Sequence, residues 1–178
     1  MPLTPLHYSL AYLIGKWKQS LSLPGLIVSS IMPDIERLTY LFIDNFHARG
    51  FLHSLFGVAT LGTALSVLFT VYAYPAVVSG VFRMDKRIAK VRCYFSKELA
   101  LACFGGGMLH VLVDSLHHEY NPTLYPFINE SFDALVLFGD WQLATTVVHS
   151  VLFALFITIF MWEATKETNG FWKRVLVS

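Results

Sequence analysis

Long uncharged stretches dominate the pattern of apolar and polar positions along the chain. The stretches 50–82 and 141–162 contain no Asp, Glu, Lys or Arg, and each holds the roughly 20 apolar residues that an α-helix needs to cross a bilayer. A third uncharged run, 99–113, is shorter and extends naturally if its end emerges into a polar site. The pattern predicts membrane helices at 57–82, 98–118 and 141–163.

The first 56 residues contain two shorter apolar runs, 4–15 and 20–32, separated by the Lys-Trp-Lys cluster at 16–18. Each run is long enough for a short helix only, so we expect a helical hairpin that enters the membrane. The cluster would form the tip of this hairpin, because lysine snorkels toward water and tryptophan favours the headgroup region.

Composition agrees with a membrane location for the whole chain. Hydrophobic residues make up 55% and charged residues 14% of the 178 positions, and the mean hydropathy of +0.56 lies well above the usual range of soluble proteins. We therefore predict an all-α fold, a single integral membrane domain over 1–178 built as a bundle of about five helices. The net charge of +1 gives no reason to expect nucleic-acid binding.

Basic residues orient the predicted helices. Six Lys or Arg side chains lie within the loop 83–97, whereas 98–165 contains none. Because loops rich in Lys and Arg stay on the cytoplasmic side, we expect this loop to be cytoplasmic. The expected location of the protein is the plasma (inner) membrane. The same loop suits contact with anionic membrane lipids. The start of 57–82 and the end of 98–118 then face the non-cytoplasmic side.

Histidines and acids gather at those non-cytoplasmic ends. His110, Asp114 and His117 follow the spacing i, i+4, i+7 and project from one stripe of a helix. Ionisable groups at membrane depth cost about 2.5 to 3.5 kcal/mol, so they seldom persist without a partner or a role. Imidazole and carboxylate groups are ligands of zinc, manganese and iron, and the topology therefore predicts a metal site near this membrane face. The expected ligands are His7, Asp34, His53, His110 and Asp114.

Four segments of the chain resemble a known family. They are Thr-Pro-Leu-His7-Tyr-Ser, Met32-Pro33-Asp34-Ile35-Glu36, Arg49-Gly50-Phe51-Leu52-His53-Ser54, and Leu109-His110-Val111-Leu112-Val113-Asp114 with Tyr125-Pro126 downstream. In this order and spacing, over about 1–127, they resemble the YdjM-type membrane-bound metal-dependent hydrolases. The resemblance implies a metal and a hydrolytic reaction, and it implies no substrate. His47 is displaced from the family's His-Arg-Gly pattern by Ala48, and Glu36 replaces an aspartate of that pattern.

These features lead to a mechanistic hypothesis. A mono- or dinuclear centre of divalent metal, zinc before manganese or iron, would activate water against a phosphoester, with a lipid of the outer leaflet as one candidate substrate. Glu36 or His117 would serve as general base. Arg49 would clamp a phosphate oxygen, although it is equally suited to anchoring a helix end at the interface. The stretch 119–140, which contains helix-breaking prolines, would cap the site.

Two other classes of protein remain open at this stage. A non-enzymatic metal or ion transporter, or an adaptor, would use the buried His and Asp residues as a permeation path. A b-type haem protein would use His53, His110 or His149 as axial ligands, but it needs no carboxylates. The glycines at 105–107 suit close helix packing rather than phosphate binding. Cys93 and Cys103 are expected to be reduced thiols.

Overall fold

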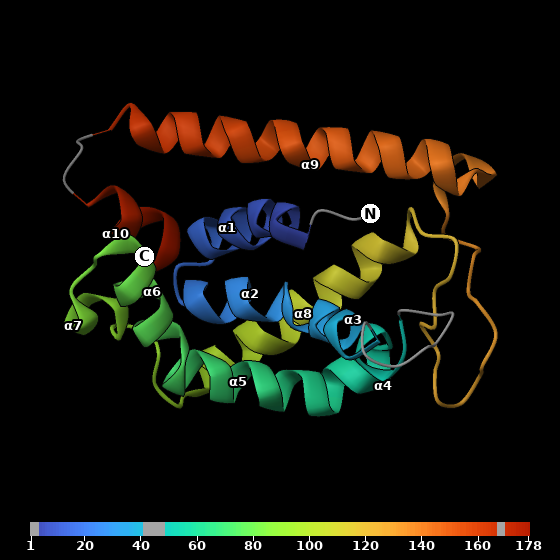
Figure 1. Ribbon diagram of the computed structural model, residues 1–178, viewed down its shortest axis with the longest axis horizontal. Coiled ribbons are helices and arrows are strands. Elements are labelled where there is room, and N and C mark those ends of the chain that lie inside the picture. The colour runs from blue at the N-terminus through green and yellow to red at the C-terminus, as the bar shows by residue number, and fades with distance from the viewer. Residues whose placement is uncertain (1–3, 41–48, 167–169) are drawn as a thin grey trace.

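The computed structural model describes residues 4–40, 49–166 and 170–178, and every regular element in these ranges is helical (Figure 1). The α-helices are α1 (Tyr8–Trp17), α2 (Leu23–Ser29), α3 (Ile35–Tyr40), α4 (Leu55–Gly57), α5 (Thr63–Tyr72), α6 (Tyr74–Phe82), α7 (Lys86–Ala89), α8 (Lys97–Ser115), α9 (Trp141–Ala164) and α10 (Phe171–Leu176). Four 3-10 turns are η1 (Thr4–His7), η2 (Met32–Asp34), η3 (Phe51–His53) and η5 (Leu137–Gly139), and a π-helical turn, η4 (Val58–Gly62), joins α4 to α5.

Within the described residues, three helical stretches are long and apolar enough to cross a membrane. They are Leu55–Tyr72, Lys97–Ser115 and Trp141–Ala164. The prediction of an all-α membrane bundle is thereby confirmed. The first stretch is shorter than the helix expected at 57–82, because the chain turns at Ala73 and starts a new helix, α6, with Pro75 in its first turn. Proline lacks the N–H that a continuing helix would need.

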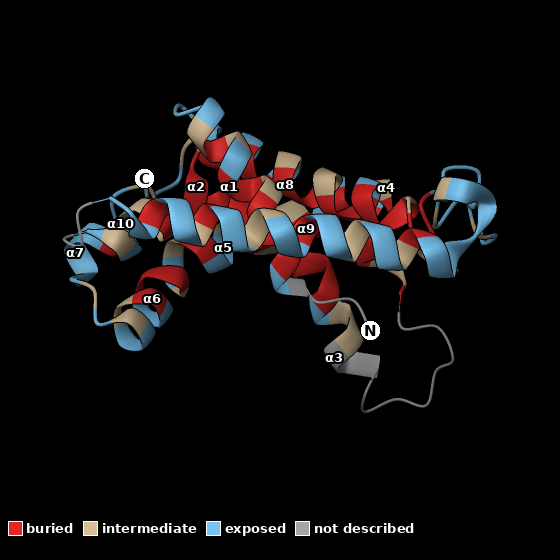
Figure 2. Ribbon diagram, turned by 90° about the horizontal axis from the view of Figure 1, so that it is seen from above, coloured by how far each residue is buried: buried red, intermediate tan, exposed pale blue. Residues whose placement is uncertain are grey.

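The N-terminal hairpin forms the middle layer of the bundle. Figure 1 shows α1 and α2 between α9 on one side and α5 on the other, with α8 crossing against α2. α9 buries a single stripe that includes Leu152 and Ile159, and the rest of its surface is exposed and largely apolar (Figure 2). A soluble monomer rarely exposes so much contiguous apolar surface, whereas a lipid-facing helix does.

Close packing joins α2 to α8. A Cβ atom added at Gly106 would lie 2.1 Å from Ser29 Oγ and 2.8 Å from the Leu26 carbonyl oxygen, so this glycine lets the two backbones approach. A Cβ at the neighbouring Gly105 would meet no atom within 4 Å. The expected packing role of the glycine run thus belongs to Gly106. Cys93 and Cys103 are both buried free thiols, as expected from the sequence.

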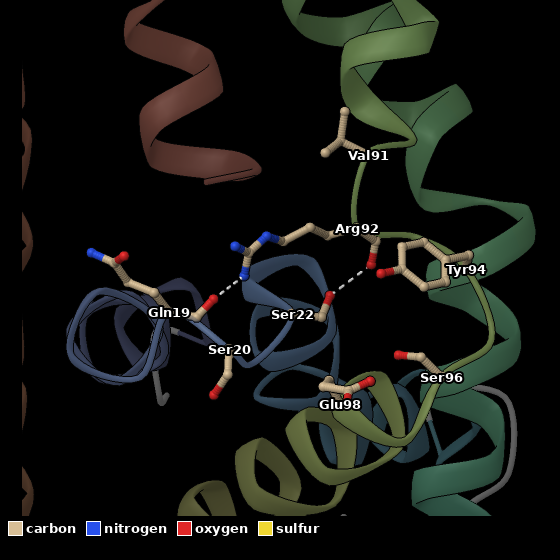
Figure 3. Close-up of a pocket in the computed structure, with 8 residues that line it drawn as sticks. All are labelled: Gln19, Ser20, Ser22, Val91, Arg92, Tyr94, Ser96 and Glu98. Atoms are coloured by element: carbon tan, nitrogen blue, oxygen red, sulfur yellow. Dashed lines mark hydrogen bonds between the residues drawn. The ribbon is translucent and has the colours of Figure 1, made fainter.

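The basic loop packs against the tip of the hairpin. The Arg92 guanidinium donates hydrogen bonds to the carbonyl oxygens of Gln19 and Leu21, the latter at 2.7 Å. Ser22 Oγ in turn donates to the Arg92 carbonyl oxygen at 2.8 Å. Figure 3 shows the Arg92–Gln19 and Ser22–Arg92 bonds among the residues that line a pocket, which also include Glu98. The loop 83–97 therefore lies at the end of the bundle where the hairpin turns.

A buried acid ties the C-terminal helix to the same end of the bundle. The Glu163 carboxylate, which is 0% exposed, accepts hydrogen bonds from Arg174 Nε at 2.7 Å, from Lys166 Nζ at 2.6 Å and from the Tyr12 hydroxyl. Because Arg174 belongs to α10, Glu163 to α9 and Tyr12 to α1, this cluster joins three helices.

We expect Glu163→Gln to destabilise the protein, because it leaves the charges of Arg174 and Lys166 without a carboxylate. Charged hydrogen bonds of this kind contribute about 1.5 to 3 kcal/mol each, so the thermal midpoint in detergent should fall by about 5 to 10 °C. Glu130→Gln, at an exposed acid, is the matched control and should leave the midpoint within about 2 °C of wild type. Equal midpoints for the two variants would contradict a stabilising role for the cluster.

Candidate metal centre

Each of the three N-terminal 3-10 turns ends on a predicted ligand. η1 ends at His7, η2 at Asp34 and η3 at His53, while His110 and Asp114 occupy the last two turns of α8. All five side chains are buried, with at most 8% of any residue exposed. The fold therefore brings together every residue that the sequence predicted as a ligand.

The distances between the donor atoms are suited to a shared cation. His7 Nε2 lies 3.3 Å from Asp114 Oδ1, and His110 Nε2 lies 3.3 Å from Asp114 Oδ2. His53 Nε2 lies 3.4 Å from Asp34 Oδ1. These separations are longer than the 2.7 to 2.9 Å or so of charge-assisted hydrogen bonds. Four ligand atoms placed tetrahedrally about 2.0 to 2.2 Å from a central ion lie about 3.3 to 3.6 Å from one another, and the observed separations match this distance.

Unsatisfied polar atoms are concentrated at this cluster. Ten buried side-chain N or O atoms in the described part of the chain have no hydrogen-bond partner; seven of them belong to the five predicted ligands and two to the adjoining His117 and His118. The tenth is Ser79 Oγ. Each buried polar atom without a partner destabilises the fold by about 1 to 3 kcal/mol. The presence of many such atoms in one place therefore requires a common explanation. Because lone pairs of imidazole and carboxylate are metal ligands, the donor set fits a divalent cation.

Outer hydrogen bonds orient two of the imidazoles. His110 Nδ1 donates to the Ser30 carbonyl oxygen at 2.8 Å, which leaves the lone pair on Nε2, facing the cluster. His53 Nδ1 bonds Glu36 Oε2 at 3.0 Å in the same way. Such carboxylate–histidine pairs are typical behind metal ligands, where they fix the tautomer and the ring orientation.

Glu36 is thus placed behind His53, whereas the sequence offered it as a general base. Its carboxylate also accepts hydrogen bonds from the backbone amides of Gly50 at 2.9 Å and Leu52 at 3.1 Å. These bonds hold the turn η3, which carries His53. Although burial alone would raise the pKa of Glu36, the bonds from His53 and the two amides lower it.

Arg49 contacts the cluster directly. Its Nη2 donates to Asp114 Oδ2 at 2.7 Å, and the residue is 9% exposed. Burial lowers the pKa of Arg49, and the charges of Asp114 and Asp34 oppose that effect. For Asp34 burial would raise the pKa, but the neighbouring imidazoles of His53 and His110 lower it to about 2. Asp34 is therefore an ionised carboxylate at neutral pH and available as a ligand.

Two further histidines follow α8 and adjoin the cluster. His117 is fully buried, and its Nδ1 donates to the Val113 carbonyl oxygen at 2.8 Å. His118 Nε2 lies 3.7 Å from Asp114 Oδ1. Burial lowers the pKa of His117 to about 4 and, together with the charge of Arg49, that of His118 to about 2, so both rings are neutral at neutral pH.

The comparison with protein families fits this geometry. A family model described as YdjM inner membrane protein matches residues 6–177. The chain belongs to this family. The predicted resemblance is confirmed, and it extends from the expected 1–127 to nearly the whole chain. No curated protein and no solved structure matches the chain.

Two further histidines of this YdjM-family protein lie at or beside the cluster. His118 was not among the expected ligands, although its spacing of four residues from Asp114 places it on the same side of a helix. His149 Nδ1 donates to the Thr145 carbonyl oxygen at 2.8 Å, and its ring packs edge-on against His117. His47 lies outside the described residues.

Proposed function

We propose that this YdjM-family protein is a membrane-embedded metal-dependent hydrolase. The observation that carries the proposal is the group of unsatisfied imidazole and carboxylate atoms around Asp114. Zinc is the expected ion, with manganese or iron as alternatives, because the donors are nitrogen and oxygen without a thiolate. Such an ion, when bound, lowers the pKa of water and withdraws charge from a phosphoryl oxygen. The residues that would hold it are His7, Asp34, His53, His110 and Asp114.

The surrounding residues would position the ligands and the substrate. Glu36 keeps His53 in its tautomer and would act as a positioning residue rather than as the base. Arg49, which is held beside the ligands by Asp114, would bind a phosphate oxygen of the substrate. Asp114 would thereby hold the Arg49 guanidinium, which binds the substrate phosphate, in a fixed position beside the metal ligands.

An apolar cavity at the start of the first membrane span supports a lipid phosphoester as substrate. Its volume is about 370 Å³. It is lined by Leu55, two residues after His53 in the chain, and the Leu55 amide donates to the Thr123 carbonyl oxygen at 3.0 Å. A cavity of this size and lining would accept part of an acyl chain. The main apolar lining residues are Leu55, Phe56, Leu124, Tyr125, Phe127 and Ile128.

Topology supports a non-cytoplasmic location for the site. The loop 119–140, next to the start of α9, lies at one end of the long axis of the molecule, and α7 of the basic loop lies at the other (Figure 1). If the basic loop is cytoplasmic, the metal site faces the opposite side of the inner membrane.

The donor set favours hydrolysis over the two other classes. A transport site is expected near the middle of the bilayer, with access from both faces. His110 and Asp114 instead lie in the last two turns of a span, nearer to one of its ends. Haem ligation would leave Asp34 and Asp114 without a role.

The proposal is tested by hydrolysis of fluorogenic phosphoesters with and without an acyl chain, using detergent-purified, zinc-loaded protein. We expect activity in wild type and a loss of about 100-fold or more in Asp34→Asn. Phe127→Ala should raise KM for the acylated substrate only, while Phe138→Ala, an exposed aromatic in the same loop but outside the cavity, should change neither constant. Activity that is equal in wild type and Asp34→Asn, or absent from both, would refute the proposal.

A further inference from the structure

The cluster contains more donors than one cation can bind. Zinc takes four ligands at a structural site and three protein ligands at a typical catalytic site. Three groups of three residues have ligand atoms within 4.8 Å of one another. The groups are His7, His110 and Asp114; Asp34, His53 and His110; and Asp114, His117 and His118. The first and second groups share His110, and the first and third share Asp114.

We propose that Asp114, His117 and His118 bind a second divalent cation, next to the one held by the first two groups. The inference rests on the proposed function for the position of the first cation. Asp114 would then be a ligand shared by the two ions. His117, which the sequence offered as a general base, would be a ligand.

The carboxylate of Asp114 has imidazoles at both of its oxygens. Oδ1 lies 3.3 Å from His7 Nε2 and 3.7 Å from His118 Nε2, and Oδ2 lies 3.3 Å from His110 Nε2. Oδ1, which has no hydrogen-bond partner, is therefore within reach of both groups of histidines, whereas Oδ2 also accepts a hydrogen bond from Arg49 Nη2 at 2.7 Å. Bridged pairs of cations are the arrangement that stabilises both the attacking and the leaving oxygen in phosphoester hydrolysis.

The end of α8 places both histidines beside that carboxylate. The backbone amides of His117 and His118 each donate to the Asp114 carbonyl oxygen at 3.1 Å, so the chain wraps around Asp114 after the helix ends at Ser115. Thr145 of α9 donates to the His117 carbonyl oxygen and fixes this turn. The two rings therefore lie together, with centroids 4.1 Å apart.

The lone pairs of both rings are directed at the cluster rather than at other partners. His117 Nδ1 carries the proton that it donates to Val113, so its unprotonated nitrogen is Nε2, which is buried and has no hydrogen-bond partner. His118 Nε2 is likewise buried without a partner. A histidine that serves only to fill the bundle would have both nitrogens satisfied or exposed to water.

The test is the metal content of the full-length protein in detergent, measured by mass spectrometry after equilibrium dialysis against zinc. We expect two equivalents in wild type and one in both His118→Gln and the His117→Gln/His118→Gln double variant. His149→Gln, which lies beside His117 but has its Nδ1 bonded to Thr145, is the matched control and should keep two. Because His118 is partly exposed, its single variant guards against a result caused by misfolding.

A second measurement, also independent of activity, reports whether the two ions are close together. In manganese-loaded protein, electron paramagnetic resonance should show the spectrum of two coupled ions in wild type and of an isolated ion in His118→Gln. One equivalent in wild type that is unchanged in the double variant would overturn the second site and leave the proposed function standing. No metal in wild type would overturn both.

Discussion

Asp114→Asn is expected to remove both divalent cations from the protein. Asp114 is the residue shared by the first and third ligand groups, and its oxygens lie 3.3 Å from the imidazoles of His7 and His110. Asparagine keeps the size of the side chain but removes its charge and offers one weakly binding oxygen. We expect metal affinity to fall by well over about 100-fold, which is more than the loss of an outer-shell partner causes. Mass spectrometry of protein purified without added metal measures this directly.

Asp133→Asn is the control for the loss of an acid at the same end of the molecule. Asp133 is exposed and accepts a hydrogen bond from Ser131, away from the imidazoles. This variant should retain the full metal content. Because Asp114→Asn also leaves Arg49 buried without its carboxylate, a melting curve must show that the variant is folded at the temperature of the assay. A folded Asp114→Asn protein with wild-type metal content would exclude Asp114 as a ligand.

The second large effect is expected from Gly106→Ala. The added Cβ would lie 2.1 Å from Ser29 Oγ and 2.8 Å from the Leu26 carbonyl oxygen, and a backbone atom cannot be moved cheaply. The helices α2 and α8 must separate, which costs about 1 to 3 kcal/mol. The site should suffer as well, because Gly106 lies one turn before His110, whose Nδ1 is bonded to Ser30 at the end of α2.

Gly105→Ala provides a matched comparison, since it makes the same chemical change one residue away. A Cβ at Gly105 meets no atom within 4 Å, so alanine should only improve helix propensity, by up to about 1 kcal/mol. Thermal midpoints in detergent should therefore move in opposite directions for the two variants. Equal midpoints for both would contradict the close packing of α2 on α8.

The spans could be predicted because an apolar stretch of about 20 residues in a membrane protein has few stable conformations other than a membrane-spanning helix. The end of the first span could have been read more closely, since Pro75 sits inside 57–82 and marks the start of α6. The grouping of the five candidate ligands could be predicted because each lies at the end of an apolar run, and the topology expected from the basic loop puts those ends on one side.

The pairing of charged residues around the site could not be predicted in the same way. Glu36 and His53 are 17 positions apart, and Arg49 and Asp114 are 65 apart. Their contacts depend on how the 3-10 turns pack against α8, and no periodicity in the sequence reports on that packing. Glu36 therefore looked like a free carboxylate suited to acid–base work, whereas the fold uses it to hold His53.

The most direct test of the central claim, a metal centre of imidazole and carboxylate ligands, is X-ray absorption spectroscopy on the purified wild-type protein at the edge of its bound metal. The account predicts a first shell of nitrogen and oxygen atoms at about 2.0 to 2.2 Å, with the outer-shell scattering of imidazole rings and no sulfur. The absence of a bound metal, or a first shell with sulfur at about 2.3 Å, would contradict it.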